Sequence, residues 1–306
     1  MSIASLTHTG GPAGQAAGQP AGRRRSGGIA YLLLLPGVAC LLVLFVVPLV
    51  TLFATSLQTR VPGGEIGQFE QTFRFANYAD AMGAYLDQFG RSFLCAAIAT
   101  ALALAISYPL AYFIAQRAGR WRNILLVLVV APFFASFLLR TLAWRQILGE
   151  QGFVVSTMHA LHLLPPGATL TASATAVVLG LTYCFLPFMT LPLYAALERI
   201  DPKLIEAGGD LYAGPFTTFR KVTLPLSMPG VVAGTLLTFI PAAGDYVNAT
   251  LLGRPPNTTM IGNVVESRFF RSVDYPTAAS LSFILMAAIL VLVVVYIWWS
   301  GTEELV

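Results

Sequence analysis

Long apolar runs without charge constrain this chain more than any other feature. Six of them divide its 306 residues: 29–59, 92–116, 124–139, 168–197, 222–244 and 275–302. A helix needs about 20 mostly apolar residues to cross the hydrocarbon core of a bilayer. Five runs reach that length directly. The run 124–139 reaches it when residues 141–144 are added, because the long side chain of Arg140 can extend toward the interface.

The composition agrees with a bilayer environment, since 56% of the residues are hydrophobic and only 10% are charged, against about a quarter charged in soluble domains. Only helices and closed barrels satisfy their backbones in lipid, and no alternating ten-residue pattern indicates a barrel. We therefore predict an all-α integral membrane protein with six transmembrane helices. The expected spans are about 29–57, 92–116, 123–145, 172–197, 226–252 and 276–300.

The start of the chain differs from the rest. Residues 1–28 are rich in Gly, Ala and Pro, which predicts a disordered tail, followed by a transmembrane domain over 29–302. Arg23–Arg25 and the next apolar run resemble the beginning of a signal peptide. That run is far longer than the usual h-region of about 7–15 residues, which favours a retained first helix. Cys40, Cys95 and Cys184 lie in apolar runs and are expected to be buried thiols.

Basic residues predict the orientation. Arg117, Arg120 and Arg122 crowd the short segment between the second and third runs, and such short basic loops face the cytoplasm. Both termini are then expected in the cytoplasm. The net charge of +4 needs no nucleic acid partner to explain it.

Several chemistries have no support in the sequence. Neither lysine, Lys203 or Lys221, follows a glycine, so the phosphate-binding pattern of ATPases is absent and this chain is not expected to hydrolyse ATP alone. His159 and His162 lack the nearby ligands of a metal site. No hydrolase motif of the G-x-S-x-G or H-E-x-x-H type occurs.

A polar segment, residues 198–225, separates the fourth and fifth predicted spans. Asp201 followed by Pro202 predicts an N-cap and the start of a short helix, which Gly214 and the following proline end. Further prolines, Pro225 and Pro229, are expected to set the start of the fifth span. A polar insert on the cytoplasmic side is best explained as a docking surface.

Two glycines begin the fifth span with the spacing G-x-x-x-G. Gly230 and Gly234 allow another helix to approach closely. A helix of the same chain is the simpler partner, and a second chain is the alternative.

The polar segment resembles the cytoplasmic EAA loop of ABC-importer permeases. The residues at matching spacings are Glu206, Ala207, Val222, Leu224 and Pro225. Two positions depart from the pattern, because Gly208 replaces an alanine and Tyr212 replaces a glycine. The tyrosine brings the tight turn at that point into question, and Gly214 is expected to supply it instead.

The resemblance implies a type I permease fold in which this loop forms coupling helices seated in a groove of a separate ATPase. It implies coupling roles for Glu206, Ala207, Gly208, Asp210, Gly214, Leu224 and Pro225. The implied partners are a homologous second permease subunit, two ATPase subunits, an extracytoplasmic substrate-binding protein and the lipid bilayer. No cofactor is expected in this chain, because ATP and Mg²⁺ would be bound by the ATPase.

Four further segments, 132–152, 191–202, 240–253 and 261–270, resemble the first permease subunit of the spermidine/putrescine family. The resemblance covers roughly residues 30–300 and implies a polyamine importer. Permeases for iron, thiamine or other small solutes share much of the pattern and remain alternatives. A self-sufficient secondary transporter is a rival from another class, although no internal repeat supports it. A scaffold protein without a pathway is a second rival. It would need no charged residue inside a span, yet Asp245 lies in one.

One acidic residue, Asp245, lies deep in an apolar stretch, where a charge costs several kcal/mol unless it is paired or faces water. Structurally, it could pair with Arg140 or Arg145, or cap a helix break after residues 242–244. Functionally, it could face the central cavity and balance the charge of a polyamine. Aromatic faces for cation–π contact would come from Tyr246, Trp144 and Tyr183.

The segments 77–90 and 153–162 are expected to be extracytoplasmic and to help seat the binding protein, with Tyr85 and Glu150 near the contact. Glu65 and Glu266 are expected on the same outer side.

Overall fold

The computed structural model describes residues 27–162, 165 and 170–300. The predicted tail, apart from its last two residues, therefore lies outside the described residues. The chain divides into two compact units, Met1–Val50 and Thr51–Val306. In the first unit, α1 (Gly27–Leu41) continues through a π-helical turn, η1 (Leu42–Val46), into the start of α2 (Val47–Ser56).

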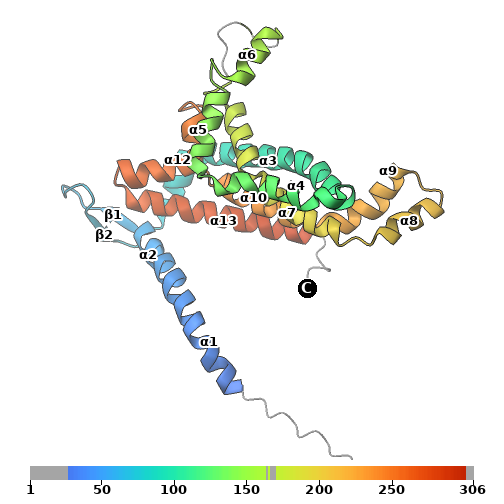
Figure 1. Ribbon diagram of the computed structural model, residues 1–306. Coiled ribbons are helices and arrows are strands. Elements are labelled where there is room, and N and C mark those ends of the chain that lie inside the picture. Colours follow the sequence, from blue (N-terminus) through green and yellow to red (C-terminus); the bar gives the residue numbers. More distant parts are fainter. Residues whose placement is uncertain (1–26, 163–164, 166–169, 301–306) are drawn as a thin grey trace, which may run out of the picture. The chain divides into compact units, whose positions relative to one another are not determined.

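The second unit is almost entirely helical (Figure 1). Its main elements are β1 (Gln58–Arg60), β2 (Phe69–Gln71), α3 (Ala76–Gln116), α4 (Arg122–Val130), α5 (Phe137–Ile147), α6 (Phe153–Ala160), α7 (Ala174–Glu198), α8 (Pro202–Asp210), α9 (Pro215–Thr218), α10 (Leu224–Ala243), α11 (Val247–Leu252), α12 (Ile261–Glu266) and α13 (Tyr275–Ser300). Short 3-10 turns, η2 (Gly119–Trp121) and η3 (Ala131–Phe134), and π-helical turns, η4 (Phe219–Thr223) and η5 (Ser267–Arg271), connect some of them.

Five helices are long and apolar enough to cross a membrane: Leu34–Ser56, Ala76–Gln116, Ala174–Glu198, Pro215–Ala243 and Tyr275–Trp299. A sixth candidate is the pair Gly119–Phe134 and Phe137–Ile147, which is bent by 95°. The third predicted span is therefore not one continuous helix. The backbone becomes extended at Ala135 and Ser136, next to a 3-10 turn that contains Pro132, so the helical hydrogen bonds cannot continue.

Small residues bring the central helices α3, α7 and α10 together. Ala96, Ala103 and Ala111 recur along one face of α3 and are fully buried, because short side chains allow helix backbones to approach closely. Leucines and methionines of α7, such as Met189 and Leu193, fill the space between these helices. The close approach of the three helix backbones therefore follows from the small residues. Many large apolar side chains elsewhere in the chain remain exposed.

The G-x-x-x-G pair packs within the chain. A side chain at Gly230 would come within 2.5 Å of Ala196 on α7, and one at Gly234 within 2.9 Å of the Met189 sulfur. The glycines of α10 thus permit its contact with α7, and the simpler of the two predicted partners is the observed one.

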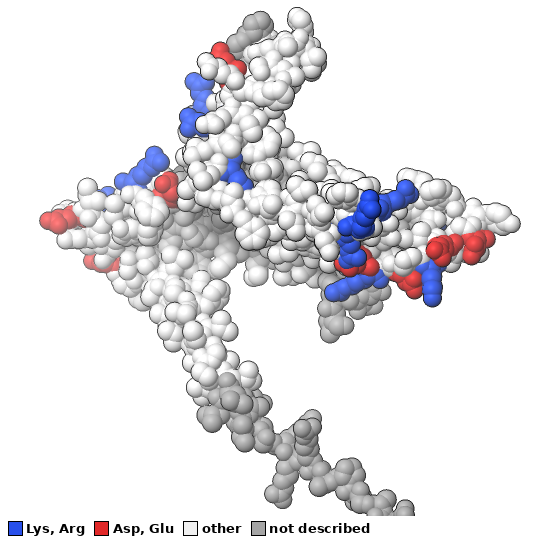
Figure 2. Space-filling view, viewed as in Figure 1, with Lys and Arg blue, Asp and Glu red and all other residues white. Residues whose placement is uncertain are grey.

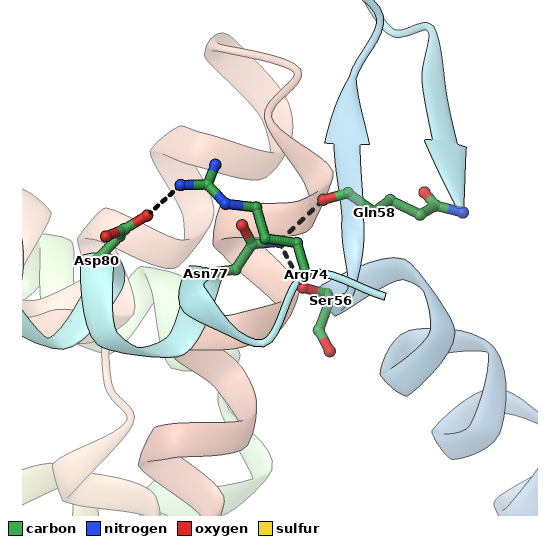
Figure 3. A network of polar contacts seen from close by, with 5 residues as sticks. All are labelled: Ser56, Gln58, Arg74, Asn77 and Asp80. Atoms are coloured by element: carbon green, nitrogen blue, oxygen red, sulfur yellow. Dashed lines mark hydrogen bonds and ion pairs between the residues drawn. The ribbon is translucent and has the colours of Figure 1, made fainter. Parts of the chain in front are cut away.

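Polar contacts at one end of the unit join the hairpin β1–β2 to the start of α3 (Figure 3). The Asn77 amide donates to the backbone carbonyls of Ser56 and Gln58, at 2.9 Å each. Arg74 pairs with Asp80 at 2.9 Å. These bonds satisfy backbone groups where α2 ends and the short hairpin begins.

The segment 77–90 is helical, because it forms the first part of α3. Helical dihedral angles break only at Tyr85, whose hydroxyl accepts a hydrogen bond from Arg268 Nε at 2.9 Å. Ala81 and Phe89 pack with residues of α12 and α13. Much of this segment therefore stabilises the bundle.

Candidate functional site

The first candidate site is the polar segment between α7 and α10, which folds into the short helices α8 and α9 (Figure 1). The predicted start of α8 is confirmed, because the Asp201 carboxylate accepts the backbone N–H of Lys203 at 3.0 Å and Pro202 occupies the first turn. Glu206 and Asp210, one helical turn apart, are both exposed on α8. The short helix therefore exposes two acidic side chains and one basic side chain, Lys203.

Gly208 has a role inside the chain. A side chain at this position would come within 2.9 Å of the Thr218 hydroxyl on α9. The absence of a side chain at Gly208, where the EAA pattern has an alanine, therefore allows α8 to lie close to α9. Gly209 is the neighbouring glycine with open space around it, and Ala207 is exposed on the same helix.

The turn after α8 is made by Tyr212. Its φ of +57° is left-handed, and its N–H donates to the Gly209 carbonyl while the N–H of Ala213 donates to Gly208. These two bonds form a Schellman motif, whose left-handed position is usually glycine. An L-residue there costs about 1–2 kcal/mol. The expectation that Gly214 supplies the turn was wrong, since Gly214 has a φ of −66° and precedes α9.

Large apolar side chains around this turn are exposed among the described residues. Tyr212 is 99% exposed, Leu211 81% and Phe216 75%. In Figure 2, acidic groups, with a basic group beside them, lie over the same end of the molecule as α8 in Figure 1. The tip of the segment therefore combines exposed apolar side chains with negative charge.

The other end of the segment runs without a break into the fifth span. A π-helical turn, η4, joins α9 to α10 just before Leu224 and Pro225. Proline has no N–H to donate to the preceding turn, and a widened turn accommodates that loss. The helix that contains Pro225 and Pro229 therefore begins earlier, at Pro215. Leu224 is half-buried and Pro225 is exposed.

The second candidate site is the break after α10. The chain leaves the helix at Gly244 and resumes it in α11 at Val247. Asp245, only 8% exposed, accepts the backbone N–H of Asn248 at 2.8 Å. Of the structural alternatives for Asp245, the structure contains the helix cap. Among the described residues, no ion pair joins Asp245 to Arg140 or Arg145.

Buried polar groups of α5, α7 and α11 meet beside this break. The Asn248 side chain is fully buried, and its oxygen accepts a hydrogen bond from the Thr141 hydroxyl at 3.3 Å. Cys184 lies 4.0 Å from that oxygen. The Arg140 guanidinium lies over Phe133 and Phe137, at 5.8 and 5.6 Å from the ring centres. Arg140 is 8% exposed, so its side chain is buried beside these rings.

The predicted pathway aromatics divide into two groups. Trp144 and Tyr183 pack edge to face, with ring centres 5.3 Å apart, against the core cluster near α7. Tyr246 is instead 47% exposed and lines an open hollow of about 720 Å³ together with Glu266 and Phe270. The rest of this hollow is lined mainly by apolar side chains, most of them on α13. Trp144 and Tyr183 therefore lie against a packed core, whereas Tyr246 faces an open hollow.

Glu266 was predicted only to lie outside, but the structure places its carboxylate at the hollow beside Tyr246. Arg271 is its nearest ion-pair partner, at 3.9 Å. The sequence contains a signal for this site, because Glu266 is followed within a few residues by two aromatic residues, Phe269 and Phe270. A carboxylate beside aromatic rings is a chemically suitable surface for an organic cation.

Residues 107–300 match the family described as "Binding-protein-dependent transport system inner membrane component". The spermidine/putrescine transport system permease protein PotB of Haemophilus influenzae is 35% identical over 83% of this chain and 88% of its own length. The protein of the same name from Escherichia coli is 33% identical over 86% of this chain and 94% of its own length. A probable molybdenum ABC transporter permease protein of Haloferax volcanii is 30% identical over 65% of this chain and 71% of its own length.

A solved bacterial alginate ABC transporter in complex with its alginate-bound periplasmic protein contains a chain of the same fold. Its TM-score is 0.68 at 17% identity, over 90% of this chain and 94% of that one. The relatives are named as permeases, which carry solutes rather than catalyse reactions, and together with the apolar helices they indicate a multi-pass membrane protein. The chain belongs to the family of binding-protein-dependent transport system inner membrane components and is a permease subunit of an ABC importer.

Proposed function

We propose that this permease forms half of the membrane pathway of an ATP-driven polyamine importer. The observation that carries the proposal is 33–35% identity to permeases named for spermidine and putrescine over 83–86% of the chain. The substrate would be supplied from outside by a binding protein and released into the cytoplasm.

The coupling role is proposed for α8, α9 and the turn between them. Their exposed side chains, including Glu206 and Asp210, are available to an ATPase subunit. The continuous helix from Pro215 to Ala243 would transmit movement of that contact to the middle of the bundle. Gly214, Leu224 and Pro225 would shape this connection, because they lie where α9 begins and where the π-helical turn ends.

The partners proposed are a homologous second permease, two ATPase subunits and an extracytoplasmic binding protein. The alginate transporter of the same fold was solved with its periplasmic protein, which supports a partner of that class. The exposed Phe153 at the start of α6 and the neighbouring Glu150 are candidates for that contact.

For the pathway, we retain Asp245 as a candidate and add Glu266. Asp245 is buried and its carboxylate already caps α11, so it would act on a passing cation through its charge. Glu266 and Tyr246 line the open hollow and could contact the cation directly. Trp144 and Tyr183 would shape the wall through their packing.

The orientation proposed places the termini, α8 and the short loop near Arg120 in the cytoplasm, with Glu65, Glu150 and Glu266 outside. The basic loop between α3 and α4 supports it. Thiol labelling of Lys203→Cys from outside intact cells would contradict both this orientation and the coupling role.

Uptake by the reconstituted importer tests the function. Proteoliposomes containing this chain, the second permease and the ATPase, supplied with the binding protein, are expected to accumulate spermidine or putrescine only with ATP. Molybdate, iron and thiamine serve as comparison solutes, since one relative is named for molybdenum. ATP-driven uptake of one of those solutes without polyamine uptake would overturn the substrate, and polyamine uptake by this chain alone without ATP would overturn the coupling.

A further inference from the structure

We propose that Tyr212 is an aromatic anchor that inserts its ring into an apolar pocket of the ATPase subunit. This inference rests on the coupling role proposed above and identifies the residue that contributes most to that contact. Three observations carry it: the backbone conformation of Tyr212, the exposure of its ring, and the charge around it.

The backbone conformation opposes a tyrosine at this position. The two hydrogen bonds of the Schellman motif require a left-handed residue, and Tyr212 provides it with a φ of +57°. Glycine would adopt the same conformation without the steric penalty of a Cβ. The stability of the turn therefore does not explain the tyrosine.

The ring of Tyr212 also lies outside the core clusters of the described residues. Its residue is 99% exposed, and its neighbours Leu211 and Phe216 are 81% and 75% exposed. Aromatic side chains of this kind are the residues that most often dominate binding energy when a partner buries them. Tyr212 is unfavourable for the turn and is not buried by its own chain. Burial of its ring by another protein would explain why a tyrosine occupies this position.

The charged side chains around the ring distinguish between two environments that could cover it, a lipid surface and a protein groove. Exposed charges of both signs lie on this segment, with Lys203 on α8 and Arg220 and Lys221 on η4. The two nearest to the turn in sequence, Glu206 and Asp210, are acidic and would be repelled by the anionic lipids of a cytoplasmic leaflet. A protein groove with an apolar floor and basic residues at its rim matches the same surface. The ATPase is the cytoplasmic partner of this permease family's importers, so we assign the groove to it.

The test compares three variants in the assembled importer. Tyr212→Gly is expected to weaken the affinity of the permease for its purified ATPase by about tenfold or more. The same variant, measured without ATPase, is expected to unfold at a temperature about 2 °C higher, because the strain is relieved. Tyr212→Phe keeps the ring and should bind as the natural chain does. Phe73→Gly, which removes an exposed ring from another left-handed position (φ +52°), should leave ATPase affinity unchanged.

A cross-link separates failure of this inference from failure of the coupling role. Lys203→Cys, at the other end of α8, is expected to cross-link to the ATPase in the complex. If it does so while Tyr212→Gly binds normally, the anchor is wrong and the coupling role stands. If no cross-link forms, the coupling role itself fails.

The membrane alternative is tested by a polarity-sensitive dye at Tyr212→Cys, with the three native cysteines replaced by alanine. In nanodiscs containing anionic lipid, the emission should shift to shorter wavelength only when ATPase is added. A dye that reports an apolar environment without ATPase would contradict the anchor.

Discussion

The segment α8–α9 and the break between α10 and α11 both interrupt an apolar chain with polar residues, but they treat those residues in opposite ways. At α8–α9, charged and apolar side chains alike are exposed, and Tyr212 is 99% exposed. At the break, Asp245 caps a helix and Asn248 is fully buried. The first region leaves its polar and apolar side chains on the surface, whereas the second encloses its polar groups within the bundle. There, the Asn248 amide nitrogen and two Arg140 nitrogens have no hydrogen-bond partner among the described residues.

Glycine substitutions should show this difference most strongly. Gly230→Val would force a side chain against Ala196 and the Pro192 carbonyl, and we expect it to destabilise the permease by about 2–3 kcal/mol or prevent folding. Gly209→Val is the matched control, because its site has open space, and its stability should change by about 0.5 kcal/mol or less. Thermal unfolding of both purified variants in detergent measures the contrast. Equal destabilisation would mean that α8 packs as tightly as α10.

A second comparison concerns the cap at the break. Asp245→Ala removes the acceptor of the Asn248 N–H and should cost about 1 kcal/mol, whereas asparagine can still cap α11. Asp245→Asn should therefore assemble normally. Uptake by the assembled Asp245→Asn importer then reports on charge alone, and normal polyamine uptake would remove Asp245 from the pathway.

The exposed carboxylate of α8 should have a smaller effect, confined to association. We expect Glu206→Ala to weaken binding of the ATPase several-fold while leaving thermal unfolding unchanged, because a charge at the rim of an interface acts mainly on encounter. Glu65→Ala removes another exposed carboxylate, near the hairpin, and serves as the control. A lower unfolding temperature for Glu206→Ala would indicate that this residue stabilises its own chain.

The smallest effect is expected at the ion pair in Figure 3. The side chains of Arg74 and Asp80 are 52% and 63% exposed, so Asp80→Asn should cost about 0.5 kcal/mol or less. Asn77→Ala should cost more, because two backbone carbonyls lose their donor. Chemical unfolding of the two variants tests this order, which would be reversed if the ion pair held the hairpin in place.

Local signals in the sequence predicted most of the spans and the start of α8, because hydrophobic length and an Asp-Pro cap act over a few residues. The 95° bend after Phe134 was missed, since Pro132 alone is common within transmembrane helices. The left-handed Tyr212 was also missed, because the motif glycine that signals such a turn is absent. The surroundings of Asp245 depend on four helices brought together by folding, so its two structural alternatives could not be separated beforehand.

The most direct test of the central claim, that α8 is a cytoplasmic surface covered by the ATPase, is thiol labelling of Gly209→Cys in a background without native cysteines. Gly209 is exposed and has nothing within 4 Å of a Cβ added there. We expect a membrane-impermeant maleimide to label it rapidly in inverted vesicles lacking the ATPase, and far more slowly once the ATPase is bound. Labelling from outside intact cells, or an unchanged rate with the ATPase bound, would contradict the account.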